Sequence, residues 1–154
     1  MRCATSSSCA NRTHNWFFDV DLARSHSEDN PVYYIQMAHA RVCGIFRVGE
    51  IAADSVTGVD VDYTALAHDD ERELVKALLG FPAALTAATR ARAPHILAGY
   101  LLETARCLHT WYHKHHVLGE AEPVRSARLA LARAAQVVLR NGLRILGINA
   151  PERM

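Results

Sequence analysis

Apolar residues recur every three or four positions over most of the chain, the spacing of an α-helix that buries one face. The first such segment follows Asn30 and Pro31, which suit an N-cap and a first helical position. We therefore predict a helix over 31–47. Its buried face should comprise Val32, Ile35, His39, Val42, Ile45 and Phe46.

Four more helices follow from the same pattern. Leucines among charged residues predict a helix over 63–79 that Gly80 ends, and alanine-rich sequence favours a short helix over 82–92. Broad apolar stripes predict helices over 94–116 and 123–146, the last ended by Gly147. The stripe of 94–116 contains Ile96, Leu97, Tyr100, Leu101, Ala105, Leu108 and Tyr112. These elements predict an all-α fold, a single helical bundle of about five helices.

Residues 1–29 lack this period. The Ser- and Cys-rich residues 1–15 favour an irregular end, whereas 16–23 alternate apolar with acidic residues, typical of a short strand or a segment laid over a core. Residues 49–63 should form an acidic loop. We therefore divide the chain into an irregular N-terminal remnant or junction, 1–29, and an α-helical domain, 30–154.

Composition is that of an ordinary globular domain, since 50% of the 154 residues are hydrophobic and 21% are charged. No apolar run approaches the roughly 20 residues that cross a bilayer, so we expect no membrane association and a cytoplasmic protein. The cysteines show no Cys-x-x-Cys spacing and are expected to be free thiols. They are Cys3, Cys9, Cys43 and Cys107.

Charge is divided unevenly along the chain. Residues 1–89 hold seven Lys and Arg against twelve Asp and Glu, net −5, whereas 90–154 hold ten against four, net +6. A positive end could attract phosphate, although arginines that only solvate helix faces would give the same count.

We find no motif of a catalytic site: the chain lacks a phosphate-binding loop, a Gly-x-Ser-x-Gly elbow and a His-Glu-x-x-His helix. His109 and His113 have a spacing that can share zinc, but two ligands are too few and we predict no metal site. Tyr33, Tyr34, Arg41 and Arg47 could stack on and bind single-stranded RNA, or could simply be part of a helix core.

Two stretches carry a family resemblance. The string Asn30 to Arg41, NPVYYIQMAHAR, resembles the segment that opens the DALR-type anticodon-binding domain of arginyl-tRNA synthetases, class I aminoacyl-tRNA synthetases. The C-terminal strings RLAL at 128–131, VLRNGL at 138–143, LGI at 146–148 and APERM at 150–154 resemble the end of that domain. With Phe18 to Ala23, similar to the preceding junction, the resemblance covers about 13–154.

The resemblance implies an α-helical bundle that binds the anticodon stem-loop of arginine tRNA, tRNA(Arg), with bases of the loop splayed out. Tyr34, Arg41, Tyr112 and Met154 match positions that contact the anticodon loop in the family. Met37 departs from the pattern, because the family usually has Tyr after the Gln. A thioether packs well but donates no hydrogen bond, so this contact should be weakened.

The family's His-Ile-Gly-His-like and Lys-Met-Ser-Lys-Ser-like signatures, which hold ATP, do not occur in this chain. We therefore expect no catalytic residue and no cofactor here, ATP belonging to the full-length family, and no aminoacylation by this chain alone. The expected partners are arginine tRNA and a catalytic domain of the synthetase. A non-catalytic subunit that pairs with a separately encoded catalytic half, or a non-functional relic, are the alternatives.

Overall fold

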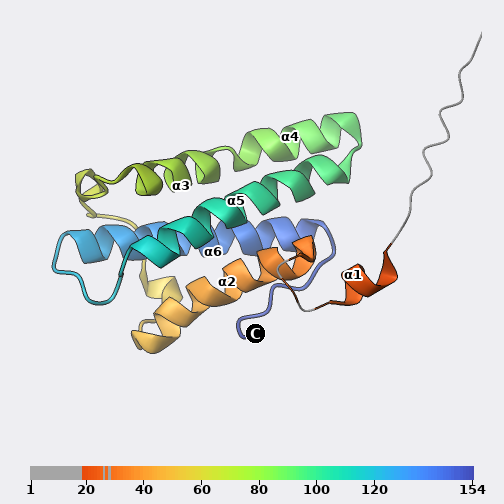
Figure 1. Ribbon diagram of the computed structural model, residues 1–154. Helices are drawn as coiled ribbons and strands as arrows, with labels where there is room; N and C mark the ends of the chain where they lie inside the picture. The colour runs from red at the N-terminus through yellow and green to blue at the C-terminus, as the bar shows by residue number, and fades with distance from the viewer. Residues whose placement is uncertain (1–18, 26, 28) are drawn as a thin grey trace, which may run out of the picture.

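Six α-helices and two short 3-10 helices make up the part of the chain that the structure, a computed structural model, describes: residues 19–25, 27 and 29–154. No strand occurs among these residues, so the predicted all-α bundle is confirmed (Figure 1). The elements are α1 Val20–Arg24, α2 Pro31–Val48, η1 Ala53–Ser55, η2 Tyr63–Ala65, α3 Asp69–Leu79, α4 Phe81–Ala91, α5 Pro94–Lys114 and α6 Val124–Ile145.

Helix α5 lies at the centre of the bundle and contacts α2, α3, α4 and α6. Helices α3 and α4 follow each other nearly end to end along one side of α5, while α2 and α6 pack together on the other (Figure 1). The core between them is built mainly from aliphatic side chains, together with the Phe46 ring and the Trp111 indole. Its largest fully buried apolar members are Trp111, Leu74, Leu97, Leu101, Leu108, Leu139 and Leu143.

Helix α2 begins as the sequence predicts. The Asn30 side chain accepts hydrogen bonds from the backbone N–H groups of Val32, at 3.1 Å, and Tyr33, at 3.5 Å. Pro31 occupies the first turn, where its missing N–H costs nothing. The predicted face is buried from Ile35 onward, whereas Val32 is 40% exposed because it lies in the first turn, ahead of the packed part of the helix.

Two predicted elements differ from the structure. The helix predicted over 63–79 begins only at Asp69, because Asp62 closes a separate 3-10 turn by accepting from the N–H of Thr64 at 3.0 Å. The Glu71 carboxylate then accepts from the N–H of His68 at 3.0 Å and caps α3.

The segment predicted as a strand or a core cover is helical over Val20–Arg24, where an acidic first turn and a basic last turn complement the helix dipole. Residues 1–18 lie outside the described residues, and the domain boundary at residue 30 stays a prediction. In the part of the chain that is described, no helix is long and apolar enough to cross a membrane.

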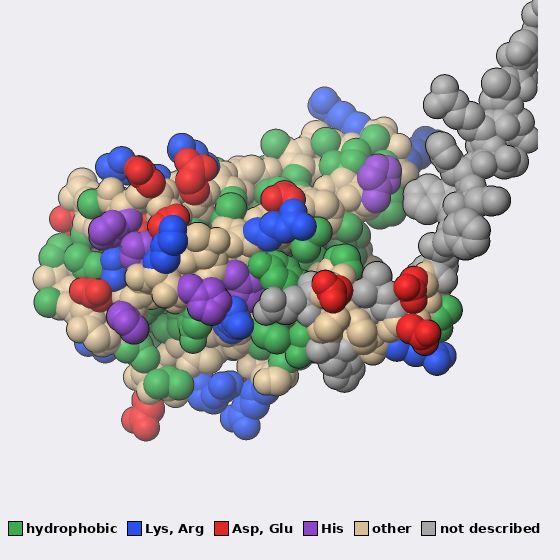
Figure 2. All heavy atoms as spheres, viewed as in Figure 1, with side chains coloured by type: hydrophobic (Ala, Val, Ile, Leu, Met, Phe, Trp, Pro, Cys, Tyr) green, Lys and Arg blue, Asp and Glu red, His purple; other side chains and the backbone are tan. Residues whose placement is uncertain are grey.

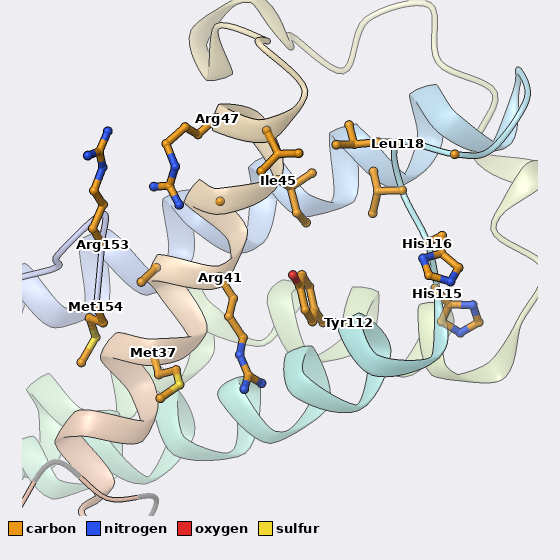
Figure 3. A pocket seen from close by; sticks show the side chains of 15 residues that line it. Met37, Arg41, Ile45, Arg47, Tyr112, His115, His116, Leu118, Arg153 and Met154 are labelled. Atoms are coloured by element: carbon orange, nitrogen blue, oxygen red, sulfur yellow. The ribbon is translucent and has the colours of Figure 1, made fainter.

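At the C-terminal end of α5, the side chain that faces the core differs from the predicted one. Tyr112, placed on the buried stripe by periodicity, is 38% exposed, and Trp111 is fully buried in its stead. Either residue continues the spacing from Leu108, and the larger indole removes more apolar surface from water. Tyr112 therefore stands at the surface, on the side of α5 that faces α2 (Figure 3).

Candidate functional site

A groove of about 800 Å³ runs along α2, bounded on one side by the end of α5 and residues 115–119 and on the other by the C-terminal tail (Figure 3). Four of the five predicted site residues line it: Met37, Arg41, Tyr112 and Met154. They come from three segments far apart in the sequence. Tyr34 is not among the lining residues.

Two histidines accept hydrogen bonds from the Arg41 guanidinium. Its Nη1 donates to His109 Nδ1 at 2.7 Å and to His113 Nε2 at 3.2 Å, and its Cζ lies 5.8 Å from the centre of the Tyr112 ring. Because a guanidinium only donates, both ring nitrogens accept and carry no proton in this arrangement. The cation is thus held by neutral groups, and within the described residues no carboxylate pairs with it.

Tyr34 is linked to Arg41 through His109. Its ring meets the buried His109 ring edge-on, with centroids 4.5 Å apart and planes at 61°. His109 uses Nδ1 to accept from Arg41, so its Nε2 carries the proton and points toward the Tyr34 carbonyl, 3.4 Å away. Tyr34 therefore contacts the histidine that accepts a hydrogen bond from Arg41.

The histidine pair has a role that spacing alone could not reveal. His109 and His113 lie on one face of α5, as predicted, but that face is turned toward the Arg41 guanidinium from α2. Among the described residues, no group of three His, Cys, Asp or Glu is placed to hold a metal ion. Figure 2 shows histidine side chains gathered on this face of the molecule, over α2 and α5.

Two further arginines line the groove: Arg47, which the sequence suggested only as a possible RNA contact, and Arg153, which it did not single out. Arg47 lies on α2 about one turn after Gly44, and Arg153 precedes Met154. Both are exposed, and no Asp or Glu side chain of the described chain pairs with either. With Arg41 they give the groove three guanidinium groups and an electrostatic preference for an anion.

Residues 115–119, which form one wall of the groove, are anchored by a buried arginine. Arg128 on α6 donates through Nη1 to the His116 carbonyl at 2.7 Å and to Glu120 at 3.0 Å, and through Nε to the Glu71 carboxylate at 2.7 Å. Glu71 is fully buried and Arg128 is 5% exposed. Burial and then the charge of Arg128 lower the pKa of His115, which favours its neutral form.

The other wall is the tail that follows α6. Gly147 takes a left-handed conformation, φ +73°, its N–H bonds to the Arg144 carbonyl at 3.0 Å, and the N–H of Ile148 bonds to the Leu143 carbonyl at 2.9 Å. This pair of hydrogen bonds is a Schellman motif, which reverses the chain after a helix. The tail then runs beside α2 and brings Met154, 54% exposed, to the groove (Figure 3).

The described cysteines take no part in the groove. Cys43 is buried on α2, Cys107 is half-buried on α5, and both are free thiols, as predicted for these two. Burial raises the pKa of each thiol and disfavours the reactive thiolate. Cys3 and Cys9 lie outside the described residues.

Comparison with known proteins gives a consistent result. The DALR anticodon binding domain family matches residues 35–154. The arginine–tRNA ligases of Salinibacter ruber and Delftia acidovorans are each 44% identical over 137 residues, a match that covers 89% of this chain and 24% of the relative. The chain therefore spans about a quarter of the length of the relatives that it matches.

Solved structures show the same correspondence. The arginyl-tRNA synthetase of Thermus thermophilus superposes with a TM-score of 0.71 at 34% identity, covering 89% of this chain and 23% of that one. A Campylobacter jejuni structure described as an arginyl-tRNA synthetase gives a TM-score of 0.77 at 29% identity and covers 29% of its chain. Since the family match extends over most of the residues, this chain belongs to the DALR anticodon binding domain family.

Proposed function

We propose that the groove binds an unstacked nucleotide of the anticodon loop of arginine tRNA. The observation that carries this proposal is the convergence of Met37, Arg41, Tyr112 and Met154 on one groove, although they lie on α2, α5 and the tail. The family resemblance implies that Arg41, Tyr112 and Met154 match positions in contact with the anticodon loop, and Met37 stands where the family usually has Tyr. The presence of Arg47 and Arg153 in the same groove adds the charge that a phosphate requires.

In this proposal each side chain contributes a specific contact to the nucleotide or to its neighbours. The Tyr112 ring offers a face for base stacking, worth ~1 to 3 kcal/mol per base, and Arg41 can hold a phosphate or a base edge. Met37 and Met154 pack their thioethers against an apolar base face. Tyr34 acts through His109, which fixes the position of the Arg41 guanidinium.

Aminoacylation would need more than this chain. The relatives named as arginine–tRNA ligases are about four times as long as the segment they share with it, since the match covers 24% to 25% of each. The ATP-binding signatures of the family are missing from the sequence. We propose that the chain supplies tRNA binding, and that the ligase activity belongs to a protein that also contains a catalytic domain.

The test is binding of the arginine anticodon stem-loop and of a stem-loop with a substituted anticodon, followed by fluorescence anisotropy over a salt series. We expect the chain to prefer the arginine loop and Arg41→Ala to remove that preference, with a loss of roughly 10-fold for the arginine loop. Arg90→Ala is the matched control, because Arg90 is an exposed arginine on α4 that does not line the groove.

Three results would argue against the proposal. Equal binding to both loops, with a steep salt dependence, would mean that only phosphate attraction operates. Equal losses in Arg41→Ala and Arg90→Ala would remove the groove as the site. Absence of binding by a folded chain would favour a subunit that pairs with a separate catalytic half, or a relic.

A further inference from the structure

The C-terminal tail is held against α2 by three side chains of that helix. Gln36 Nε2 donates to the Asn149 carbonyl at 2.8 Å, His39 Nδ1 to the Pro151 carbonyl at 2.9 Å, and Arg47 Nη1 to the Glu152 carbonyl at 3.3 Å. In the described part of the chain, no backbone group of residues 149–154 bonds to another backbone group. These side chains are therefore the polar anchors of the tail.

His39 is the buried member of this set. It is 1% exposed, whereas the Gln36 and Arg47 contacts lie at the surface. A carbonyl oxygen can only accept, so the Pro151 contact fixes the proton of the imidazole on Nδ1. Cys43, one turn further along α2, places its Sγ 3.8 Å from both ring nitrogens.

This contact lies three residues before the end of the chain. Arg153 and Met154, which follow after Glu152, are the only tail residues that line the groove, in the part of the chain that is described. His39 itself does not line it. Any effect of His39 on the groove must therefore pass through Pro151 and the position of the tail.

We propose that His39 is a positioning residue that holds the tail in the place where Arg153 and Met154 complete the groove. The proposal rests on the proposed function for its consequence, tighter binding of the anticodon loop. Its first part, the placement of the tail, does not depend on RNA. A histidine that only fills space in the core is the competing explanation.

Two substitutions separate these explanations. His39→Leu keeps an apolar side chain in the buried site but leaves the Pro151 carbonyl without its donor. His39→Asn places an amide N–H near the position of Nδ1 and can restore the hydrogen bond. Should His39→Leu fail to fold, Gln36→Leu removes a neighbouring anchor at the surface and serves in its place.

Tail placement is read without RNA from the methyl signals of ¹³C-methyl methionine, assigned with Met154→Leu among the three methionines of the chain. We expect His39→Leu to move the Met154 signal toward that of an unfolded chain and His39→Asn to return it. In RNA binding, His39→Leu should weaken the arginine loop about 3- to 10-fold, and His39→Asn less than about 2-fold. After deletion of both Arg153 and Met154, His39→Leu should cause no further loss.

Each result decides something. An unchanged Met154 signal in folded His39→Leu would overturn the positioning role, whatever RNA binding shows. A displaced tail with unchanged RNA affinity would overturn the link to the groove. Equal losses with and without Arg153 and Met154 would show that His39 acts only through general stability. If the wild-type chain binds no RNA, the proposed function fails while the methyl signals still test the anchor.

Discussion

Removal of the Arg128 guanidinium should be among the most destabilising single changes in this chain. The Glu71 carboxylate is fully buried and has Arg128, 5% exposed, as its cation. Leaving a buried carboxylate without its partner costs about 3 to 5 kcal/mol, and Arg128→Met should reach that range. Glu71→Leu should cost less, because Arg128 keeps its ion pair with Glu120 at 3.0 Å and its hydrogen bond to the His116 carbonyl.

The double variant should cost less than the sum of the two. With both charges gone, the double variant loses two hydrogen bonds to backbone, those to His68 N–H and the His116 carbonyl, about 1 kcal/mol each, and the partly exposed ion pair of Arg128 with Glu120. A double-mutant cycle from urea unfolding followed by far-UV circular dichroism measures this difference. Additive losses in Arg128→Met and Glu71→Leu would refute a coupled buried pair.

Three further predictions concern other parts of the fold. A Cβ at Gly142 would lie 2.9 Å from Leu101 Cδ1, so Gly142→Ala should destabilise the chain by about 1 to 3 kcal/mol, and Leu101→Ala should recover part of that in thermal unfolding. Burial lowers the pKa of His39 below 6.5, so that as the pH falls the unfolded chain takes up a proton before the folded chain does. The free energy of unfolding should therefore decrease as the pH drops below 6.5 and level off below the pKa of the folded state. The urea midpoint of His39→Asn should decrease less over the same pH range. Cys43 should react with a thiol reagent only after unfolding, as peptide mapping would show, and rapid labelling of the native chain would contradict its burial.

Much of the fold follows from local rules in the sequence. Asn30 and Pro31 set the start of α2, and Gly147 ends α6, because each satisfies or relieves a specific backbone requirement at a helix end. The start of α3 did not follow, since residues 63–68 have helical composition but use Asp62 and Glu71 as two separate caps. Which cap closes which turn depends on contacts that a propensity scale does not contain.

The sequence names candidate residues for the site but not their geometry. A family resemblance selected Met37, Arg41, Tyr112 and Met154, and the fold then placed all four in one groove. Periodicity put Tyr112 in the core, since a stripe that continues by three or four residues cannot distinguish it from Trp111. The position of the Arg41 guanidinium between His109 and His113 depends on the packing of α2 against α5, which no local pattern encodes.

The groove depends on polar groups in the interior as much as on the apolar core. Its two walls are loop and tail segments without regular structure, and each is fixed by a buried side chain that bonds to its backbone: Arg128 to the His116 carbonyl and His39 to the Pro151 carbonyl. Apolar residues could fill the same volumes, often without loss of stability, but could not donate to a carbonyl. We infer that these buried donors serve placement of the groove walls, so that their loss should weaken RNA binding in addition to any loss of stability.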